Sequence, residues 1–157
     1  MKITPLDAPL GARITGVDFP KPPDEHVAAE IRSIIHEYQV AIFPSQTFNA
    51  EQQLAFTQVL GPVRKRKLPA DYVVPVSSSK TPGIAYVSNI RDANGERTGV
   101  IPDGEMWFHH DMCYDPAPHK GTFLYAMELP SSGGNTLFAN MYTAYDSLPE
   151  DLKKRLN

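Results

Sequence analysis

The spacing of apolar positions predicts two kinds of element in the first third of the chain. Residues 2–6 and 12–18 are predicted to be short strands around a turn at residues 9–11, and residues 40–44, VAIFP, a buried strand. Between them, residues 24–39 have apolar side chains at intervals of three and four, which predicts an amphipathic helix. These side chains are Val27, Ile31, Ile34 and Ile35.

Two capping patterns predict further helices. Asn49 is followed three residues later by Gln52, which resembles a capping box, so a helix is predicted to begin there and to end near Gly61. Ser147 and Glu150 form the same pattern, and a helix is predicted to begin in the segment that follows them. The sequence ends inside this last predicted helix.

The second half of the chain reads mainly as strands and turns. Strands are predicted at residues 84–90 (IAYVSNI), 121–129 (GTFLYAMEL) and 135–140 (NTLFAN), with a glycine turn at residues 130–134. Residues 63–105 otherwise have the composition of loops, including a basic run at 64–67, a serine tract at 77–79 and a turn at 93–95. A lid or substrate loop would lie in this long segment.

Composition describes an ordinary globular protein. The chain has 157 residues, 41% of them hydrophobic and 21% charged, with a net charge of -3, so one domain is expected and nothing indicates a nucleic-acid partner. The longest apolar runs are too short to cross a membrane, and the N-terminus lacks the apolar stretch of a secretory signal. Cys113 is the only cysteine, so no intrachain disulfide forms and a cytoplasmic location is expected.

The candidate chemistry lies in residues 106–115, MWFHHDMCYD. If this segment is extended, His109, Asp111 and Cys113 share one face and His110 takes the other. Cys113 would need a nearby base to act as a nucleophile, and no oxyanion-hole loop accompanies it. A small buried thiol is the simpler interpretation of Cys113.

Metal binding suits the same segment better. An imidazole and a carboxylate two residues apart on a strand project to one side, so His109 and Asp111 can bind one ion. These are the ligand types of the 2-His-1-carboxylate site of Fe(II) oxygenases, and zinc uses them too. The two residues therefore leave the identity of the ion open.

Four segments of the chain resemble one family. They are residues 10–19 (LGARITGVDF), 37–63, 107–114 (WFHHDMCY) and 124–156, the last with a Pro-x-x-Gly-Gly-x-Thr turn that is the most specific of them. Together they resemble the taurine dioxygenase / 2,4-dichlorophenoxyacetate dioxygenase (TauD/TfdA-like) family of iron- and 2-oxoglutarate-dependent dioxygenases.

The resemblance implies a role for particular residues. It makes His109 and Asp111 catalytic iron ligands, and it makes Thr136 a contact for a carboxylate of 2-oxoglutarate, to which a hydroxyl can donate. His110 stands at the variable position of the motif, where it is expected to line the substrate side instead of binding iron. Asn89, beside Tyr86 and Arg91, is a further substrate-contact candidate.

The resemblance also implies a fold and a reaction. The fold expected is mostly β with flanking helices: a double-stranded β-helix, or jelly-roll, without its C-terminal strands, which would leave exposed apolar surface around Phe123, Tyr125 and Leu137. The reaction expected is hydroxylation of a small anionic organic substrate with O2, giving succinate and CO2. The oligomeric state stays open, a homo-oligomer included.

The family has a second iron-binding histidine and an arginine for 2-oxoglutarate well downstream of the Gly-Gly-x-Thr turn. No residue after 157 is present to supply them. His119 is too close to be the distal ligand, because only seven residues separate it from Asp111. The chain therefore resembles the N-terminal part of a dioxygenase domain, with little turnover expected by itself. Two other classes stay open: a non-catalytic β-sandwich binding module and a zinc-dependent hydrolase.

Overall fold

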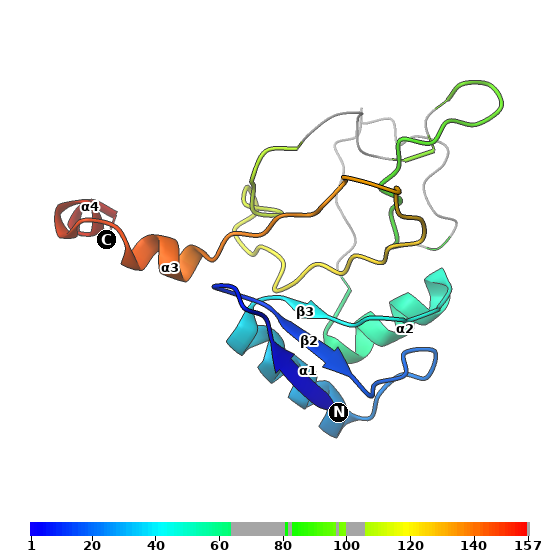
Figure 1. Cartoon of the computed structure of the whole chain (residues 1–157), viewed down its shortest axis with the longest axis horizontal. Coiled ribbons are helices and arrows are strands. Elements are labelled where there is room, and N and C mark those ends of the chain that lie inside the picture. Colours follow the sequence, from blue (N-terminus) through cyan, green and yellow to red (C-terminus); the bar gives the residue numbers. More distant parts are fainter. Residues whose placement is uncertain (64–80, 82, 97, 100–105, 157) are drawn as a thin grey trace. The chain divides into compact units, whose positions relative to one another are not determined.

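The structure is a computed structural model that describes residues 1–63, 81, 83–96, 98–99 and 106–156 (Figure 1). The chain divides into two compact units. The first unit comprises Met1–Asp18, Glu25–Gln46 and Leu124–Asn157, and the second comprises Phe19–Asp24 and Thr47–Phe123. That all 157 residues form one domain stays a prediction.

A three-stranded mixed sheet forms the base of the first unit. Its strands are β1 (Lys2–Pro5), β2 (Ala12–Thr15) and β3 (Ala41–Ile42), in the order β1-β2-β3. β1 and β2 are antiparallel, and β2 and β3 are parallel. The first two predicted strands are thus confirmed, with shorter bounds. The prediction of a buried strand at residues 40–44 is wrong in part, because β3 lies at an edge of the sheet and has two residues, of which Ile42 is exposed.

Helix α1 (Glu25–Tyr38) provides the core of this unit, as its apolar spacing predicts. It lies along the small sheet (Figure 1), and its Ile34 packs with Ala12 and Ile14 of β2. Partly buried side chains extend the cluster: Val17, Tyr38, Ala41 and Phe43. The turn between β1 and β2 requires glycine at position 11. Its φ is +100°, and a Cβ there would lie 2.8 Å from a methyl carbon of Leu6.

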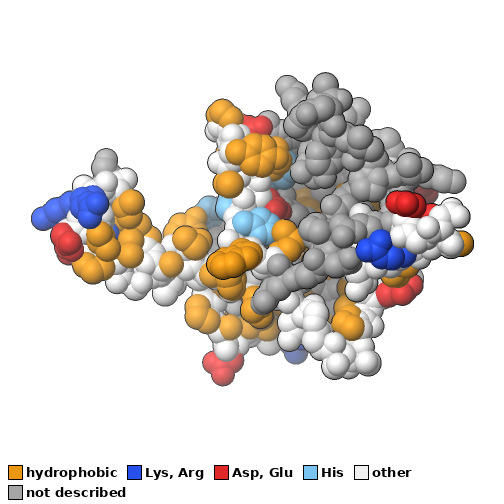
Figure 2. Space-filling model, turned by 90° about the horizontal axis from the view of Figure 1, so that it is seen from above, with side chains coloured by type: hydrophobic (Ala, Val, Ile, Leu, Met, Phe, Trp, Pro, Cys, Tyr) orange, Lys and Arg blue, Asp and Glu red, His pale blue; other side chains and the backbone are white. Residues whose placement is uncertain are grey.

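Two short helices end the described part of the first unit. They are α3 (Met141–Asp146), which the sequence patterns do not predict, and α4 (Glu150–Leu156), which they do. The predicted capping box at Ser147 is wrong, because Ser147 ends α3 and its hydroxyl donates to the carbonyl of Ala144, 2.8 Å away. Figure 2 shows apolar side chains beside basic ones over α4.

Asn140 joins α3 to the N-terminal hairpin. Its Oδ1 accepts hydrogen bonds from the backbone N–H groups of Tyr142 and Thr143, at 3.0 and 3.1 Å, which caps the helix. Its Nδ2 donates to the carbonyl oxygen of Pro9 at 2.7 Å. One side chain therefore begins a helix and connects it to the turn before β2.

Helix α2 (Ala50–Leu60) organises the second unit. Its predicted capping box is present, since Asn49 and Gln52 exchange two hydrogen bonds of 2.9 Å each, and the helix ends at Gly61 as expected. Phe56, on this helix, is buried. Its ring packs on that of Phe19, 3.8 Å away, and edge-on against that of Phe123, 5.9 Å away.

The strands predicted at residues 84–90, 121–129 and 135–140 are wrong: none of these segments is a strand in the structure. A strand requires a neighbour to receive its backbone hydrogen bonds. In the described part of the chain, only β1, β2 and β3 form a sheet. The observed class is therefore a small mixed sheet with helices, and a double-stranded β-helix is not seen among the described residues.

The predicted turns are supported where they are described. Residues 92–96 form a tight loop in which the N–H of Asp92 donates to the carbonyl of Glu96 at 2.8 Å, with Gly95 at a φ of +82°. Gly133 and Gly134 also have positive φ, as the glycine turn requires. The basic run at 64–67 and the serine tract at 77–79 lie outside the described residues. Within the described ranges, no helix is long and apolar enough to cross a membrane.

Candidate metal centre

The histidine-aspartate motif lies on a turn in the second unit, not on a strand. Residues 111–114 reverse the chain, and Met112 adopts a φ of +57°, which is unusual for a residue with a side chain. The N–H of Cys113 donates to the carbonyl of His110 at 3.3 Å, and that of Asp115 donates to Met112 at 3.0 Å. The expectation of an extended segment with alternating faces is therefore wrong.

The turn nevertheless brings the two predicted ligands together. His109 Nε2 and Asp111 Oδ1 are 3.2 Å apart, and about half of each side chain is exposed, 51% and 46%. Two ligand atoms at right angles on an ion, each about 2.1 Å from it, are themselves about 3 Å apart. The observed separation is compatible with two neighbouring ligands of a single ion, and it is also that of an ion pair when His109 is protonated.

The other ring nitrogen of His109 is held by the backbone. Its Nδ1 lies 2.9 Å from the carbonyl oxygen of Trp107 and donates to it. Histidines that bind metals commonly donate their second ring N–H to a carbonyl or carboxylate, which fixes the tautomer and the ring orientation. In His109 this arrangement leaves Nε2 as the nitrogen that could bind a metal.

The electrostatics of the pair follow from these contacts. The pKa of His109 is raised mainly by the hydrogen bond to the Trp107 carbonyl and also by the charge of Asp111. Burial lowers this pKa, but by less than the bond to Trp107 raises it. The pKa of Asp111 is lowered first by a hydrogen bond from Thr122 and then by the charges of His109 and His119, while burial opposes them. Asp111 therefore stays a carboxylate at neutral pH.

Thr122 is a neighbour of the pair that sequence reasoning missed. Its hydroxyl donates to Asp111 Oδ2 at 2.7 Å, on the oxygen that does not face His109. Eleven residues separate the two positions. No spacing rule connects a threonine to an aspartate across an irregular loop of this length, so the sequence holds no signal for this contact.

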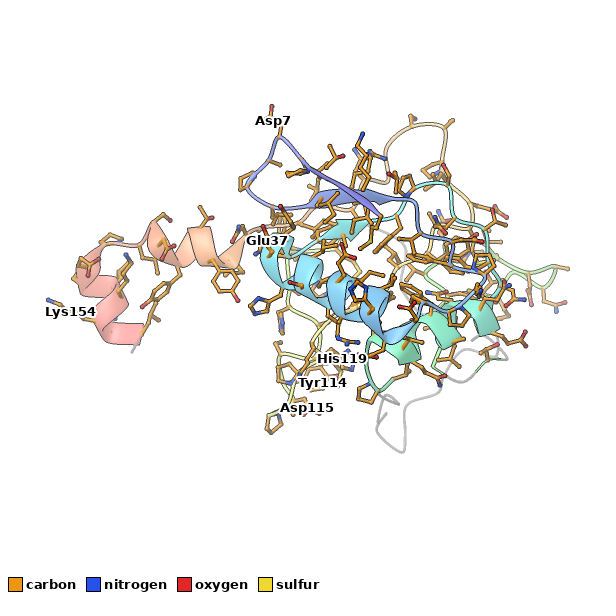
Figure 3. The ribbon with its side chains drawn as sticks, turned by 90° about the horizontal axis from the view of Figure 1, so that it is seen from below. Asp7, Glu37, Tyr114, Asp115, His119 and Lys154 are labelled. Atoms are coloured by element: carbon orange, nitrogen blue, oxygen red, sulfur yellow. The ribbon has the colours of Figure 1, made fainter. Side chains whose placement is uncertain are left out.

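His119 is the second neighbour. It lies on the same irregular segment as Tyr114 and Asp115 (Figure 3), and its charge contributes to the low pKa of Asp111. Its Nε2 is buried and has no hydrogen-bond partner in the structure. Among the described residues, no group of three His, Cys, Asp or Glu side chains is placed to hold a metal ion. Of the predicted ligands in the described residues, the structure thus brings together two, His109 and Asp111.

The other residues of the motif are open to solvent. His110 is exposed, and Trp107 is 91% exposed. Cys113 is exposed as well, so its interpretation as a buried thiol is wrong: the turn directs it outward instead of into a core. Exposure alone does not make Cys113 a nucleophile, because a thiol also needs a neighbouring base to activate it.

The remaining candidates stay predictions. Asn89 is exposed in the second unit, and Arg91 donates to the carbonyl of Gly95 at 3.0 Å within the loop. Thr136 is exposed and belongs to the first unit, where it follows the turn at Gly133 and Gly134. His109 and Asp111 belong to the second unit, and each unit is described by itself.

The pair of donors defines a candidate site for one metal ion with nitrogen and oxygen ligands. Comparison with known proteins places the chain further: it belongs to the taurine catabolism dioxygenase TauD, TfdA family, which matches residues 2–157. Enzymes of this family are dioxygenases that use Fe(II) and 2-oxoglutarate. His109 and Asp111 supply donor types that suit Fe(II).

Three relatives illustrate the likeness. The chain is 34% identical over 154 residues to an (S)-phenoxypropionate/alpha-ketoglutarate-dioxygenase of Sphingobium herbicidovorans, covering 98% of this chain and 50% of the relative. It is 36% identical to pentalenolactone F synthase of Streptomyces avermitilis, covering 94% and 47%. It is 29% identical to an alpha-ketoglutarate-dependent 2,4-dichlorophenoxyacetate dioxygenase of Cupriavidus pinatubonensis, covering 97% and 54%. The chain thus spans about half the length of these relatives.

Proposed function

We propose that the full-length protein that contains these residues is an Fe(II)- and 2-oxoglutarate-dependent dioxygenase. It uses O2 to hydroxylate a small anionic organic substrate and releases succinate and CO2. The observation that carries the proposal is the 3.2 Å approach of His109 Nε2 to Asp111 Oδ1 in a chain of the TauD, TfdA family. This approach supplies two neighbouring ligand atoms from two side-chain types that Fe(II) accepts.

Each proposed site residue has a distinct task. His109 and Asp111 bind the iron, and the carbonyl of Trp107 holds the imidazole so that Nε2 faces the carboxylate. Iron, when bound, supplies the oxidation chemistry with 2-oxoglutarate and O2. Thr136 donates its hydroxyl to a carboxylate of 2-oxoglutarate. His110 and Asn89 contact the substrate.

The proposal includes the rest of the domain. The fold proposed is the double-stranded β-helix, completed by residues that this chain does not contain. The third iron ligand, a histidine, and the arginine for 2-oxoglutarate are proposed to lie among those residues, because the relatives are about twice as long as the match. These 157 residues alone are therefore expected to have little or no turnover.

The names of two relatives support an anionic substrate. Phenoxypropionate and 2,4-dichlorophenoxyacetate are both carboxylates that carry an aromatic ether. We take an aryloxy carboxylate as the first substrate class to test. We also propose a cytoplasmic location and a homo-oligomer.

The experiment uses the full-length gene product. Under anaerobic conditions, Fe(II) and 2-oxoglutarate should give a weak visible charge-transfer band that is absent from His109→Ala. Aerobic addition of phenoxypropionate should then release succinate in proportion to substrate consumed. Substrate binding that His109→Ala leaves unchanged, with no succinate formed, would indicate a non-catalytic module. Hydrolysis that retains zinc and needs neither O2 nor 2-oxoglutarate would indicate a zinc hydrolase.

A further inference from the structure

We propose that Thr122 is a positioning residue for Asp111: its hydroxyl holds Oδ2, so that Oδ1 alone is presented to the metal beside His109 Nε2. The inference rests on the proposed function, because it concerns how this chain prepares its carboxylate for iron. Thr122 itself touches neither the metal nor the substrate.

The geometry divides the carboxylate between two tasks. Oδ2 accepts the Thr122 hydroxyl at 2.7 Å, whereas Oδ1 lies 3.2 Å from the imidazole nitrogen. A hydroxyl donating to a carboxylate oxygen at this distance makes a strong, charge-assisted hydrogen bond. Because Oδ2 is engaged in this way, Asp111 is directed to bind through one oxygen, which leaves coordination positions open.

Positioning is needed because Asp111 lies on an exposed turn. Its side chain is 46% exposed, and side chains with that exposure change rotamer within picoseconds to nanoseconds unless a contact holds them. Met112, the next residue, is in the left-handed region at a φ of +57°, so the local backbone offers no regular element to fix the carboxylate. The Thr122 hydroxyl holds Oδ2, while the His109 imidazole lies 3.2 Å from Oδ1, and together these contacts favour one orientation.

Thr122 is itself anchored to the packed part of the second unit. The next residue, Phe123, packs edge-on against the buried Phe56 of α2 at 5.9 Å. Threonine is also restricted at χ1 by its branched Cβ. A contiguous series of contacts therefore runs from α2 through Phe56, Phe123 and Thr122 to the carboxylate.

The first test compares three variants of this chain by titration with Co(II), an air-stable substitute for Fe(II). Loss of a residue that orients a ligand typically weakens metal affinity about 10–100-fold, and that is the range expected for Thr122→Val, which keeps the shape and removes the hydroxyl. Thr122→Ser, which keeps the hydroxyl, should stay within about threefold of the parent chain. The matched control is Thr98→Val, which removes a 2.8 Å hydroxyl contact to the Ile90 carbonyl in the same unit and should change nothing.

Two further readouts separate positioning from a merely structural role. The visible Co(II) band reports coordination number, and it should change in Thr122→Val because the carboxylate is free to bind through both oxygens. In the metal-free chain, the χ1 couplings of Asp111 measured by NMR should indicate one rotamer in the parent and an average in Thr122→Val. Far-UV circular dichroism of the variant should match the parent.

The outcomes distinguish this inference from the proposed function. If the parent chain binds Co(II), His109→Gln abolishes binding, and Thr122→Val binds like the parent, the role of Thr122 is refuted and the metal site stands. An unchanged single rotamer of Asp111 in Thr122→Val refutes it equally. If the parent chain and the full-length protein both fail to bind Co(II), the metal site and the role of Thr122 are refuted together.

Discussion

The N-terminal 46 residues and the segment 106–139 have similar shares of apolar residues, 20 of 46 and 16 of 34, but very different structures. β-Branched residues are more frequent in the first region, with eleven against two. The first contains a sheet and a helix around Ala12, Ile14 and Ile34, all of which are buried. The second contains no strand, and its large apolar side chains are mainly exposed. The difference teaches that an apolar pattern becomes structure only where a partner for it lies within reach. The first region contains its own partner, a helix whose hydrogen bonds are internal.

The largest expected effect tests the packed region. Ile14→Ala removes a side chain that is 1% exposed and lies at the centre of the cluster, so the free energy of unfolding should fall by about 2–5 kcal/mol. In Leu129→Ala the same kind of truncation falls on a side chain that is 79% exposed, and the loss should stay within about 0.5 kcal/mol. Urea unfolding of both variants measures the contrast. Equal losses would show that segment 106–139 is as well packed as the N-terminal region.

The next largest expected effect is on metal affinity, and it compares the adjacent histidines His109 and His110 in the irregular region. His109→Gln should weaken Co(II) binding by about 100-fold or more, because loss of an orienting neighbour alone costs about 10–100-fold. His110→Gln should leave the affinity unchanged, since His109, not His110, approaches Asp111. Titration followed by the visible Co(II) band compares the two. A larger loss in His110→Gln would reverse the ligand assignment.

The pH dependence of metal binding follows from the raised pKa of His109. Its ordinary value is 6.5, and the Trp107 carbonyl and Asp111 raise it. Below that raised pKa a proton occupies Nε2, so Co(II) affinity should fall by about tenfold per pH unit as the pH drops through and below it. Asp111, whose pKa is lowered, stays charged over this range and adds no second step. Titrations between about pH 5.5 and 8.5 measure the profile, and a flat profile would contradict the ligand role of Nε2.

The smallest effect tests the link between the two ends of the first unit. Asn140→Ala removes the cap of α3 and the bond to Pro9 together, and should cost about 1 kcal/mol. Asn140→Asp keeps an acceptor for the helix N–H groups but cannot donate to Pro9. Amide exchange at Tyr142 and Thr143 should therefore quicken in Asn140→Ala and remain slow in Asn140→Asp. Equal exchange in both variants would mean that the cap contributes nothing.

The sequence predicts elements whose stability is local. Helix α1 follows from its apolar spacing, and α2 follows from the reciprocal bonds of Asn49 and Gln52. The strands expected at residues 84–90, 121–129 and 135–140 depend on neighbours, and the described residues give them none. The apolar spacing does not predict helix α3, because its six residues are too few to show a repeating apolar face.

The candidate site is predicted in its composition but not in its geometry. His109 and Asp111 lie together as the motif suggests, yet a turn with Met112 in the left-handed region joins them, not a strand. Thr122 and His119 reach Asp111 through the path of an irregular loop, which no residue spacing encodes. Local chemistry is therefore readable from the sequence, and long-range placement is not.

The bond from Asn140 to Pro9 joins positions that are 131 residues apart. During synthesis, the hairpin and α1 leave the ribosome long before Asn140 is made, and domains generally begin to fold from the N-terminus. The carbonyl of Pro9 is therefore expected to be hydrogen-bonded to water until Asn140 is made and donates to it. Closing so long a loop costs chain entropy, although that cost grows slowly with length. We expect α3 to dock late, after the hairpin, with a folding rate that is sensitive to Asn140.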